Sequence, residues 1–297
     1  MSTEKEKLTL SQALILIFLS TVVVSGSATL VWLYFIRVQE QRSNDPAYEI
    51  TEIEQRSRSS ISLPSAYLAE IMNLSVDKSS NLYRFDTRLA RQELKKSPYI
   101  KAARVWKLEP GRVFVDYIPR EPLAFLIDYQ DVLMDRSGVL MPQFPCYGPL
   151  LLPEIRLGLS GFSKENGGKW NQAIENSRLD LAFDILDLCK RIFPSSRIQR
   201  IDVAQAEAKS YGERQVIVMI DEEFLVSEEK TLVMPRTLRL NVRSYYQELH
   251  DYLVLSQHLK ELELKKAEAS SERFYIADEL VIDLRIPQLA YIEKIRS

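Results

Sequence analysis

The stretch NLYRFDTRLARQELKKSPYIKAARVWKLEPGRVFVDYIPREPLAF, residues 81–125, decides the fold that the sequence predicts. Asp86 is a favourable N-cap residue for a short helix. Apolar side chains recur at helical spacing around it, at Phe85, Leu89, Ala90 and Leu94. We expect this helix to end at Ser97, because the residue before a proline is disfavoured in the helical conformation.

Two strands and a turn complete this stretch. Residues 100–106 and 113–117 read as strands, and Glu-Pro-Gly at 109–111 is suited to the turn between them. Upstream, residues 48–53 alternate like a strand, and residues 62–74 begin with a capping serine and an early proline, as helices do. The predicted order is therefore strand, helix, helix, strand, strand.

These motifs resemble, in order and spacing, the POTRA domain of the FtsQ/DivIB family of bacterial cell division proteins. The family's opening N-L-ϕ-x-ϕ-D is matched at 81–86, and its P-W/Y-V/I-x-x-A-x-V strand at 97–105. Its P-x-x-L/V-x-V hairpin is matched at 110–115 and its E-R-x-P-x-A exit at 120–124, although Pro119 stands where the family usually has glutamate. The resemblance implies a non-enzymatic division protein.

The composition is that of a folded chain with room for about two domains. The 297 residues are 46% hydrophobic and 27% charged, and the net charge of -2 provides no electrostatic footprint for nucleic acid. Nine glycines are few, and no Walker or dinucleotide fingerprint is present. We therefore expect no nucleotide cofactor, no small-molecule substrate and no nucleic-acid partner.

Residues 8–36 contain no charged side chain and are long enough to cross a bilayer. A cleaved signal peptide is the competing interpretation, because residues 25–28 are small and offer a cleavage site. The apolar run continues beyond them to Phe35, which favours an uncleaved signal anchor. The chain is thus expected to have a cytoplasmic tail (1–7), a transmembrane helix (8–36), a linker (37–47), a POTRA domain (48–124) and a β domain (125–297).

The charges beside this span do not predict its orientation clearly. Lys5 and Lys7 precede it but are offset by two glutamates, whereas several arginines follow it. A simple count would place the large C-terminal part inside, yet long domains translocate largely regardless of such charges. The family resemblance implies the opposite orientation, with the C-terminal domains outside the cytoplasmic membrane, at the division septum.

The C-terminal part is predicted to be a sheet with two packed helices, so the fold class is α+β. Residues 133–140, LMDRSGVL, are similar to the hairpin that begins the family's second domain, with Asp135 and Gly138 suited to the turn. Helices are expected at 170–193 and 244–265, and loops at 158–169 and 265–273. Strands are expected at 198–203, 215–221, 223–226, 237–242, 280–285 and 289–292.

No set of residues in the sequence predicts catalysis or metal binding. His250 and His258 lie eight residues apart on a predicted helix, too far apart to share an ion as an i, i+4 pair does. No serine or cysteine nucleophile with a base is apparent. Cys189 is expected in the core, and pairing of Cys146 with Cys189 stays open.

The resemblance does imply a partner-binding segment near the C-terminus. In FtsQ-like proteins the C-terminal edge of the β domain binds FtsB (DivIC), which acts with FtsL. Carried over, the segment is 285–293, with contacts from Arg285, Ile286, Gln288, Leu289, Tyr291 and Glu293. An open sheet edge can accept a strand of another chain. The alternative hypothesis is a POTRA-type chaperone or transport factor for secreted or outer-membrane polypeptides, which would use the POTRA edge instead.

Overall fold

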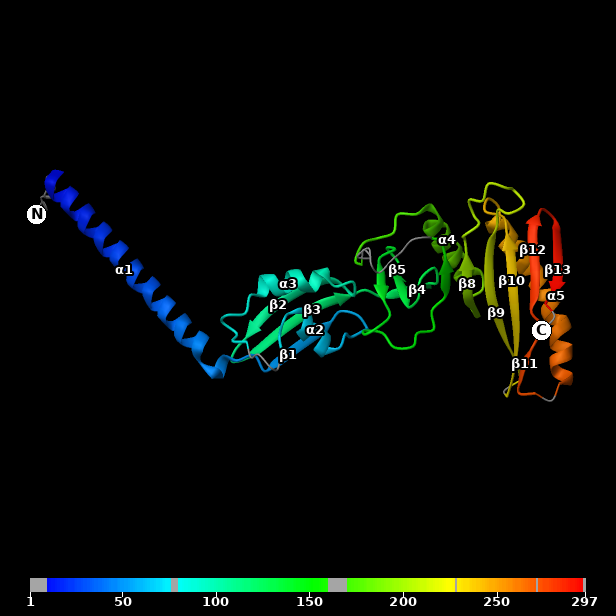
Figure 1. The fold of residues 1–297 in the computed structure, drawn as a ribbon, viewed down its shortest axis with the longest axis horizontal. Coiled ribbons are helices and arrows are strands. Elements are labelled where there is room, and N and C mark those ends of the chain that lie inside the picture. Colours follow the sequence, from blue (N-terminus) through cyan, green and yellow to red (C-terminus); the bar gives the residue numbers. More distant parts are fainter. Residues whose placement is uncertain (1–9, 76–79, 160–169, 228, 271, 296–297) are drawn as a thin grey trace, which may run out of the picture. The chain divides into compact units, whose positions relative to one another are not determined.

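The computed structural model describes residues 10–75, 80–159, 170–227, 229–270 and 272–295. The chain divides into two compact units. Unit 1 comprises residues 1–95 and 102–118, and unit 2 comprises residues 96–101 and 119–297. An apolar N-terminal helix and two sheet-containing bodies make the protein a mixed α+β chain, which confirms the predicted fold class at this level (Figure 1).

Helix α1, Leu10–Asn44, is long and apolar enough to cross a membrane. The span Leu14–Asn44 has a mean hydropathy of 2.3 in its most apolar part, and no residue of that part is buried inside the structure. The helix continues through most of the segment expected to be a linker. Its end is tied to the body of unit 1, because Arg42 donates to the Tyr83 hydroxyl at 2.6 Å and Asn81 donates to the Arg42 carbonyl at 3.0 Å.

The body of unit 1 has the predicted order of elements. A 3₁₀ turn at Pro46–Tyr48 leads to β1 (Glu52–Ser57), α2 (Ser65–Ile71), α3 (Thr87–Lys96), β2 (Ile100–Leu108) and β3 (Arg112–Pro119). The first strand was predicted four residues too early. Asp45 accepts from the Ala47 backbone N–H at 2.9 Å, and this cap starts a 3₁₀ turn that includes Tyr48, the first residue of the expected strand.

The strands of unit 1 form a three-stranded sheet in the order β1-β3-β2, within the described residues. β1 is parallel to β3. Val113, Val115 and Tyr117 alternate along β3 and are all buried, together with Leu68 of α2 and Leu94 of α3. The Tyr117 hydroxyl accepts from the Leu63 backbone N–H at 2.8 Å, so this core tyrosine also holds the segment before α2.

Unit 2 contains a ten-stranded sheet, within the described residues, and two helices. Its elements are β4 (Pro122–Leu126), β5 (Val132–Asp135), β6 (Leu140–Pro142), β7 (Glu154–Arg156), α4 (Ser177–Ile192), β8 (Ser196–Asp202), β9 (Val216–Ser227), β10 (Lys230–Leu240), α5 (Tyr245–Ala269), β11 (Phe274–Ile276), β12 (Leu280–Ile286) and β13 (Leu289–Lys294). The strand order is β13-β12-β10-β9-β8-β7-β4-β5-β6, and β11 pairs with β10.

The two helices share one core with the sheet. Their buried residues include Leu186 and Cys189 of α4 and Leu249 and Tyr252 of α5, which join Val218 of β9 in a single cluster. The expectation that Cys189 belongs to the core is therefore confirmed. The other residues of this cluster come from strands on both sides of β9, so the helices cover the middle of the sheet.

Several element boundaries in unit 2 differ from the predictions. The strands expected at 215–221 and 223–226 are one strand, β9, because Glu222 lies within a continuous ladder with β10. Helix α4 begins at Ser177 rather than at residue 170. Asn176 caps this start by accepting a hydrogen bond from the Arg178 backbone N–H. Helix α5 continues to Ala269, past the predicted end at 265, and most of the loop expected at 158–169 lies outside the described residues.

Candidate protein-binding edge

The β12–β13 hairpin forms one border of the sheet in unit 2 (Figure 1). Among the described residues, β13 pairs only with β12, and all six of its residues are exposed. A terminal strand has one row of backbone N–H and C=O groups without partners in the sheet. This border can therefore accept an additional strand.

A tight turn closes the hairpin. Pro287 supplies the restricted φ that suits the first central position, and Gln288 has a φ of 65° at the second. The register shifts between Asp283 and Ile286, so a bulge precedes the turn. Both features re-aim the end of the hairpin relative to the rest of β12.

Five of the six predicted partner-binding residues are exposed on this hairpin. Ile286, Leu289 and Tyr291 are 61%, 57% and 64% exposed, and Gln288 and Glu293 are exposed as well. Large apolar side chains together on a strand border are typical of surfaces that bind other proteins. The structure thus brings these five side chains together at one border.

Arg285, the sixth residue, is engaged within the chain. Its Nε donates to the Asp283 carboxylate at 2.9 Å, and its Nη1 donates to the Gly212 carbonyl at 2.8 Å. Burial raises the pKa of Asp283, but the hydrogen bonds from Arg285 outweigh it, and the net pKa is lowered. Arg285 therefore fastens β12 to the loop that contains Gly212, and its guanidinium is less available to a partner than the sequence suggested.

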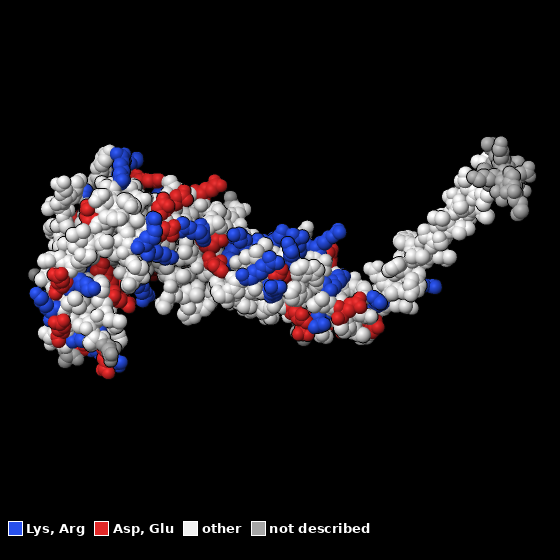
Figure 2. All heavy atoms as spheres, turned by 180° about the vertical axis from the view of Figure 1, so that it is seen from behind, with Lys and Arg blue, Asp and Glu red and all other residues white. Residues whose placement is uncertain are grey.

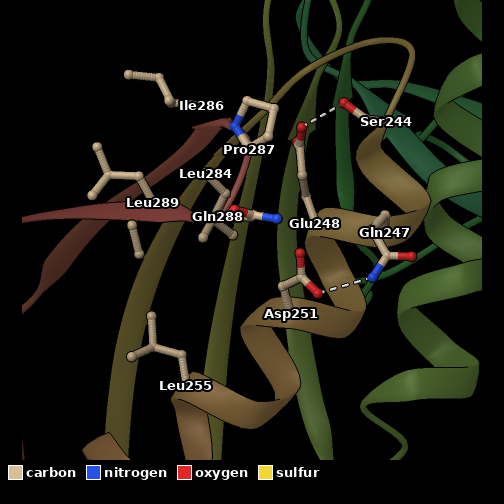
Figure 3. A pocket seen from close by; sticks show the side chains of 11 residues that line it. Ser244, Gln247, Glu248, Asp251, Leu255, Leu284, Ile286, Pro287, Gln288 and Leu289 are labelled. Atoms are coloured by element: carbon tan, nitrogen blue, oxygen red, sulfur yellow. Dashed lines mark hydrogen bonds between the residues drawn. The ribbon is translucent and has the colours of Figure 1, made fainter.

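A pocket of about 600 Å³ lies between the hairpin and the first turns of α5 (Figure 3). The hairpin lines it with Leu284, Ile286, Pro287, Gln288, Leu289 and Ala290, and α5 and its cap line it with Ser244, Gln247, Glu248, Asp251 and Leu255. The pocket therefore has a mainly apolar wall from the hairpin and a mainly polar wall with two carboxylates from α5, directly next to the exposed border.

The carboxylates of the pocket are held by α5 and by the residues just before it. Glu248 accepts hydrogen bonds from the Ser244 hydroxyl at 2.6 Å and from the Asn241 backbone N–H at 2.7 Å, and Asp251 accepts from Gln247 at 2.9 Å (Figure 3). Burial raises the pKa of Glu248, whereas its hydrogen bonds with Ser244 and Asn241 lower it in part. Sequence reasoning missed this pocket, because its two walls lie about thirty residues apart in the chain and only the fold joins them.

No three His, Cys, Asp or Glu side chains come close enough to hold a metal ion in the part of the chain that the structure describes. Cys146 and Cys189 are both free thiols. Basic and acidic side chains are intermixed on the visible face of unit 2 (Figure 2).

No protein-family model matches the sequence, and no curated protein matches it either.

Proposed function

We propose that this chain is a non-enzymatic, single-pass membrane scaffold of the bacterial division machinery. It links FtsB/DivIC-like and FtsL-like membrane proteins to septal peptidoglycan synthesis by accepting a partner strand at β13. The N-terminus lies in the cytoplasm, and the body of unit 1 and unit 2 lie outside the cytoplasmic membrane at the septum. The family, the partners and the location come from the resemblance of residues 81–125 to FtsQ/DivIB proteins.

The observation that carries this proposal is the open border at β13. Strand addition uses main-chain hydrogen bonds for affinity and the pockets for alternate side chains for specificity. β13 offers both, since its outer main chain has no strand partner among the described residues and Tyr291 and Leu289 are exposed on it. The pocket beside Leu289 can receive a side chain of the incoming strand.

Two further observations support the membrane and POTRA parts of the proposal. α1 is long and apolar enough to anchor the chain. The body of unit 1 has the order βααββ that the resemblance implies for a POTRA domain, and its strands are arranged β1-β3-β2 within the described residues.

The second candidate function, a POTRA-type chaperone or transport factor, would use the border of the sheet in unit 1. β2 is a terminal strand of that sheet and is nine residues long. It has exposed charges at Lys101, Arg104 and Lys107, which discourage edge pairing. β13 has exposed apolar residues from Leu289 to Ile292 and charges only at its last two residues, whereas the charges of β2 are spread along the strand. This difference favours the scaffold.

Co-purification of the full chain with FtsB/FtsL-like proteins tests the proposal. Tyr291→Asp should reduce partner recovery at least tenfold, because an interface tyrosine often contributes about 2 kcal/mol and a charge there would be desolvated. Tyr246→Asp is the matched control, since Tyr246 is equally exposed but lies on α5 outside the pocket. Equal recovery with Tyr291→Asp and wild type would remove the β13 border from the proposal.

A further inference from the structure

Three polar side chains lie buried between α5 and the sheet of unit 2. Glu222 of β9, Arg236 of β10 and Tyr252 of α5 are each at most 2% exposed. Burial raises the pKa of Tyr252, the negative charge of Glu222 raises it further, and the positive charge of Arg236 lowers it. The hydroxyl is thus under the influence of both charges, and the three groups form one cluster.

The strand register makes Glu222 and Arg236 diagonal neighbours on adjacent strands. Glu222 lies opposite Met234, and Arg236 lies two residues further along β10 on the same buried face. The backbones of such diagonal neighbours lie about 7–8 Å apart, a distance that long side chains can span. Glu222 Oε2 makes no direct hydrogen bond with Arg236 among the described residues. Burial raises the pKa of Glu222, and the positive charge of Arg236 lowers it in part.

Polar atoms of this cluster lack hydrogen-bond partners. Arg236 Nη1 donates to the carbonyls of Pro235 and Asp278, at 2.8 and 3.0 Å. The Tyr252 hydroxyl lies close enough to Glu222 and Arg236 for both to shift its pKa, but its geometry with neither is that of a direct hydrogen bond. Arg236 Nε and Nη2 and Glu222 Oε2 likewise make no direct hydrogen bond within the described chain. Buried polar atoms are almost always hydrogen-bonded, and buried water is the usual partner where protein groups are too far apart.

We infer that Glu222, Arg236 and Tyr252 hold an internal water site that bridges the carboxylate, the guanidinium and the hydroxyl. The carboxylate and hydroxyl accept hydrogen bonds and the guanidinium donates them, so a water molecule between them has the two to four partners that a buried water needs. Lys260, the nearby cation of α5, lies over the Phe224 ring, 3.7 Å from its centre. Because Tyr252 belongs to α5 and the two charged residues belong to β9 and β10, the water bridge joins the helix to the sheet.

The water site also positions the pocket beside the β12–β13 hairpin. Tyr252 is flanked in α5 by Asp251 and Leu255, which line that pocket. A helix fastened through Tyr252 holds both pocket residues at a constant distance from the hairpin. This consequence for partner binding rests on the proposed function, whereas the water site itself does not.

A double-mutant cycle in the full chain tests the coupling, with amide hydrogen exchange of α5 as the measurement. Arg236→Met leaves a buried carboxylate without its counter-charge and should lower the protection of the α5 amides about a hundredfold or more. Glu222→Met should act similarly. The double variant should recover protection to within about tenfold of wild type, because no unpaired charge remains. Independent, additive losses would overturn the inference.

Matched variants separate this effect from general damage. Arg200→Met removes an arginine from a solvent-exposed pair with Glu154 on the same sheet, and α5 protection should stay unchanged. Tyr252→Phe removes only the hydroxyl, so it tests the cluster even if the methionine variants fail to fold. It should lower α5 protection about tenfold, and unchanged protection would contradict a bridging role.

An experimental electron-density map decides between water and a direct ion pair. Density for a water within hydrogen-bond distance of Glu222 and Arg236 supports the inference, and a direct contact or an empty gap overturns it. Partner recovery with Tyr252→Phe is measured separately. If exchange responds and recovery does not, the water site stands while its link to the proposed function fails.

Discussion

Gly138 occupies a position that side chains tolerate poorly. It follows β5 in the turn before β6, and its φ is +75°. Asp135 shapes this turn by accepting from the N–H groups of Ser137 at 2.9 Å and Val139 at 3.0 Å. The sequence prediction that Asp135 and Gly138 form a turn is therefore confirmed in its local geometry.

Gly138→Ala should destabilise unit 2 by about 2 kcal/mol, since a left-handed residue with a Cβ costs about 1–2 kcal/mol and a clash adds to this. The new Cβ would lie 2.7 Å from Leu179 Cδ2, inside the core. Chemical denaturation of the full chain measures the change. Gly148→Ala is the control, because no atom lies within 4 Å of its added Cβ. Equal stability of the two variants would contradict this account.

At the scale of elements, the start of α5 links stability to pH. Glu248 is buried there, and burial raises its pKa. A carboxyl with a higher pKa in the folded chain than in the unfolded chain binds more protons when folded. Its contribution to the free energy of unfolding therefore increases as the pH falls through the folded pKa, and is complete below the unfolded value of about 4.3.

Glu248→Gln should flatten the pH dependence of unfolding over the interval in which the pH falls through the folded pKa toward the unfolded value of about 4.3. The wild-type chain should gain stability over this interval relative to the variant, because only the wild type takes up the proton at this position. Denaturant titrations at several pH values measure the slope. Glu261→Gln, at an exposed position of the same helix, should leave the slope unchanged. An unchanged slope with Glu248→Gln would show that Glu248 does not contribute.

At the scale of the whole molecule, the orientation of α1 decides which compartment holds the body of unit 1 and unit 2. The scaffold hypothesis requires them outside the cytoplasm. A reporter that is active only outside the cytoplasm should therefore work when fused after Ser297, and a reporter that is active only inside should not. The inside reporter fused before Met1 is the control and should be active. Activity of the inside reporter at Ser297 would overturn the proposed location.

The local elements of this protein are largely determined by its sequence alone. Alternation in residues 113–117 and helical spacing around Leu94 predicted β3 and α3, because local periodicity reports which face is buried. Errors arose at element ends. Asp45 and Asn176 cap turns and helices through single side-chain hydrogen bonds, and such contacts shift a boundary by several residues without altering the periodicity.

Only the tertiary structure decided which residues share a site. The border at β13 was predicted from resemblance, but the engagement of Arg285 by Gly212 and the pocket between α5 and the hairpin depend on strand order. The buried cluster of Glu222, Arg236 and Tyr252 likewise joins three elements. Contacts between residues far apart in sequence depend on the order and register of the strands, and local periodicity does not predict that order.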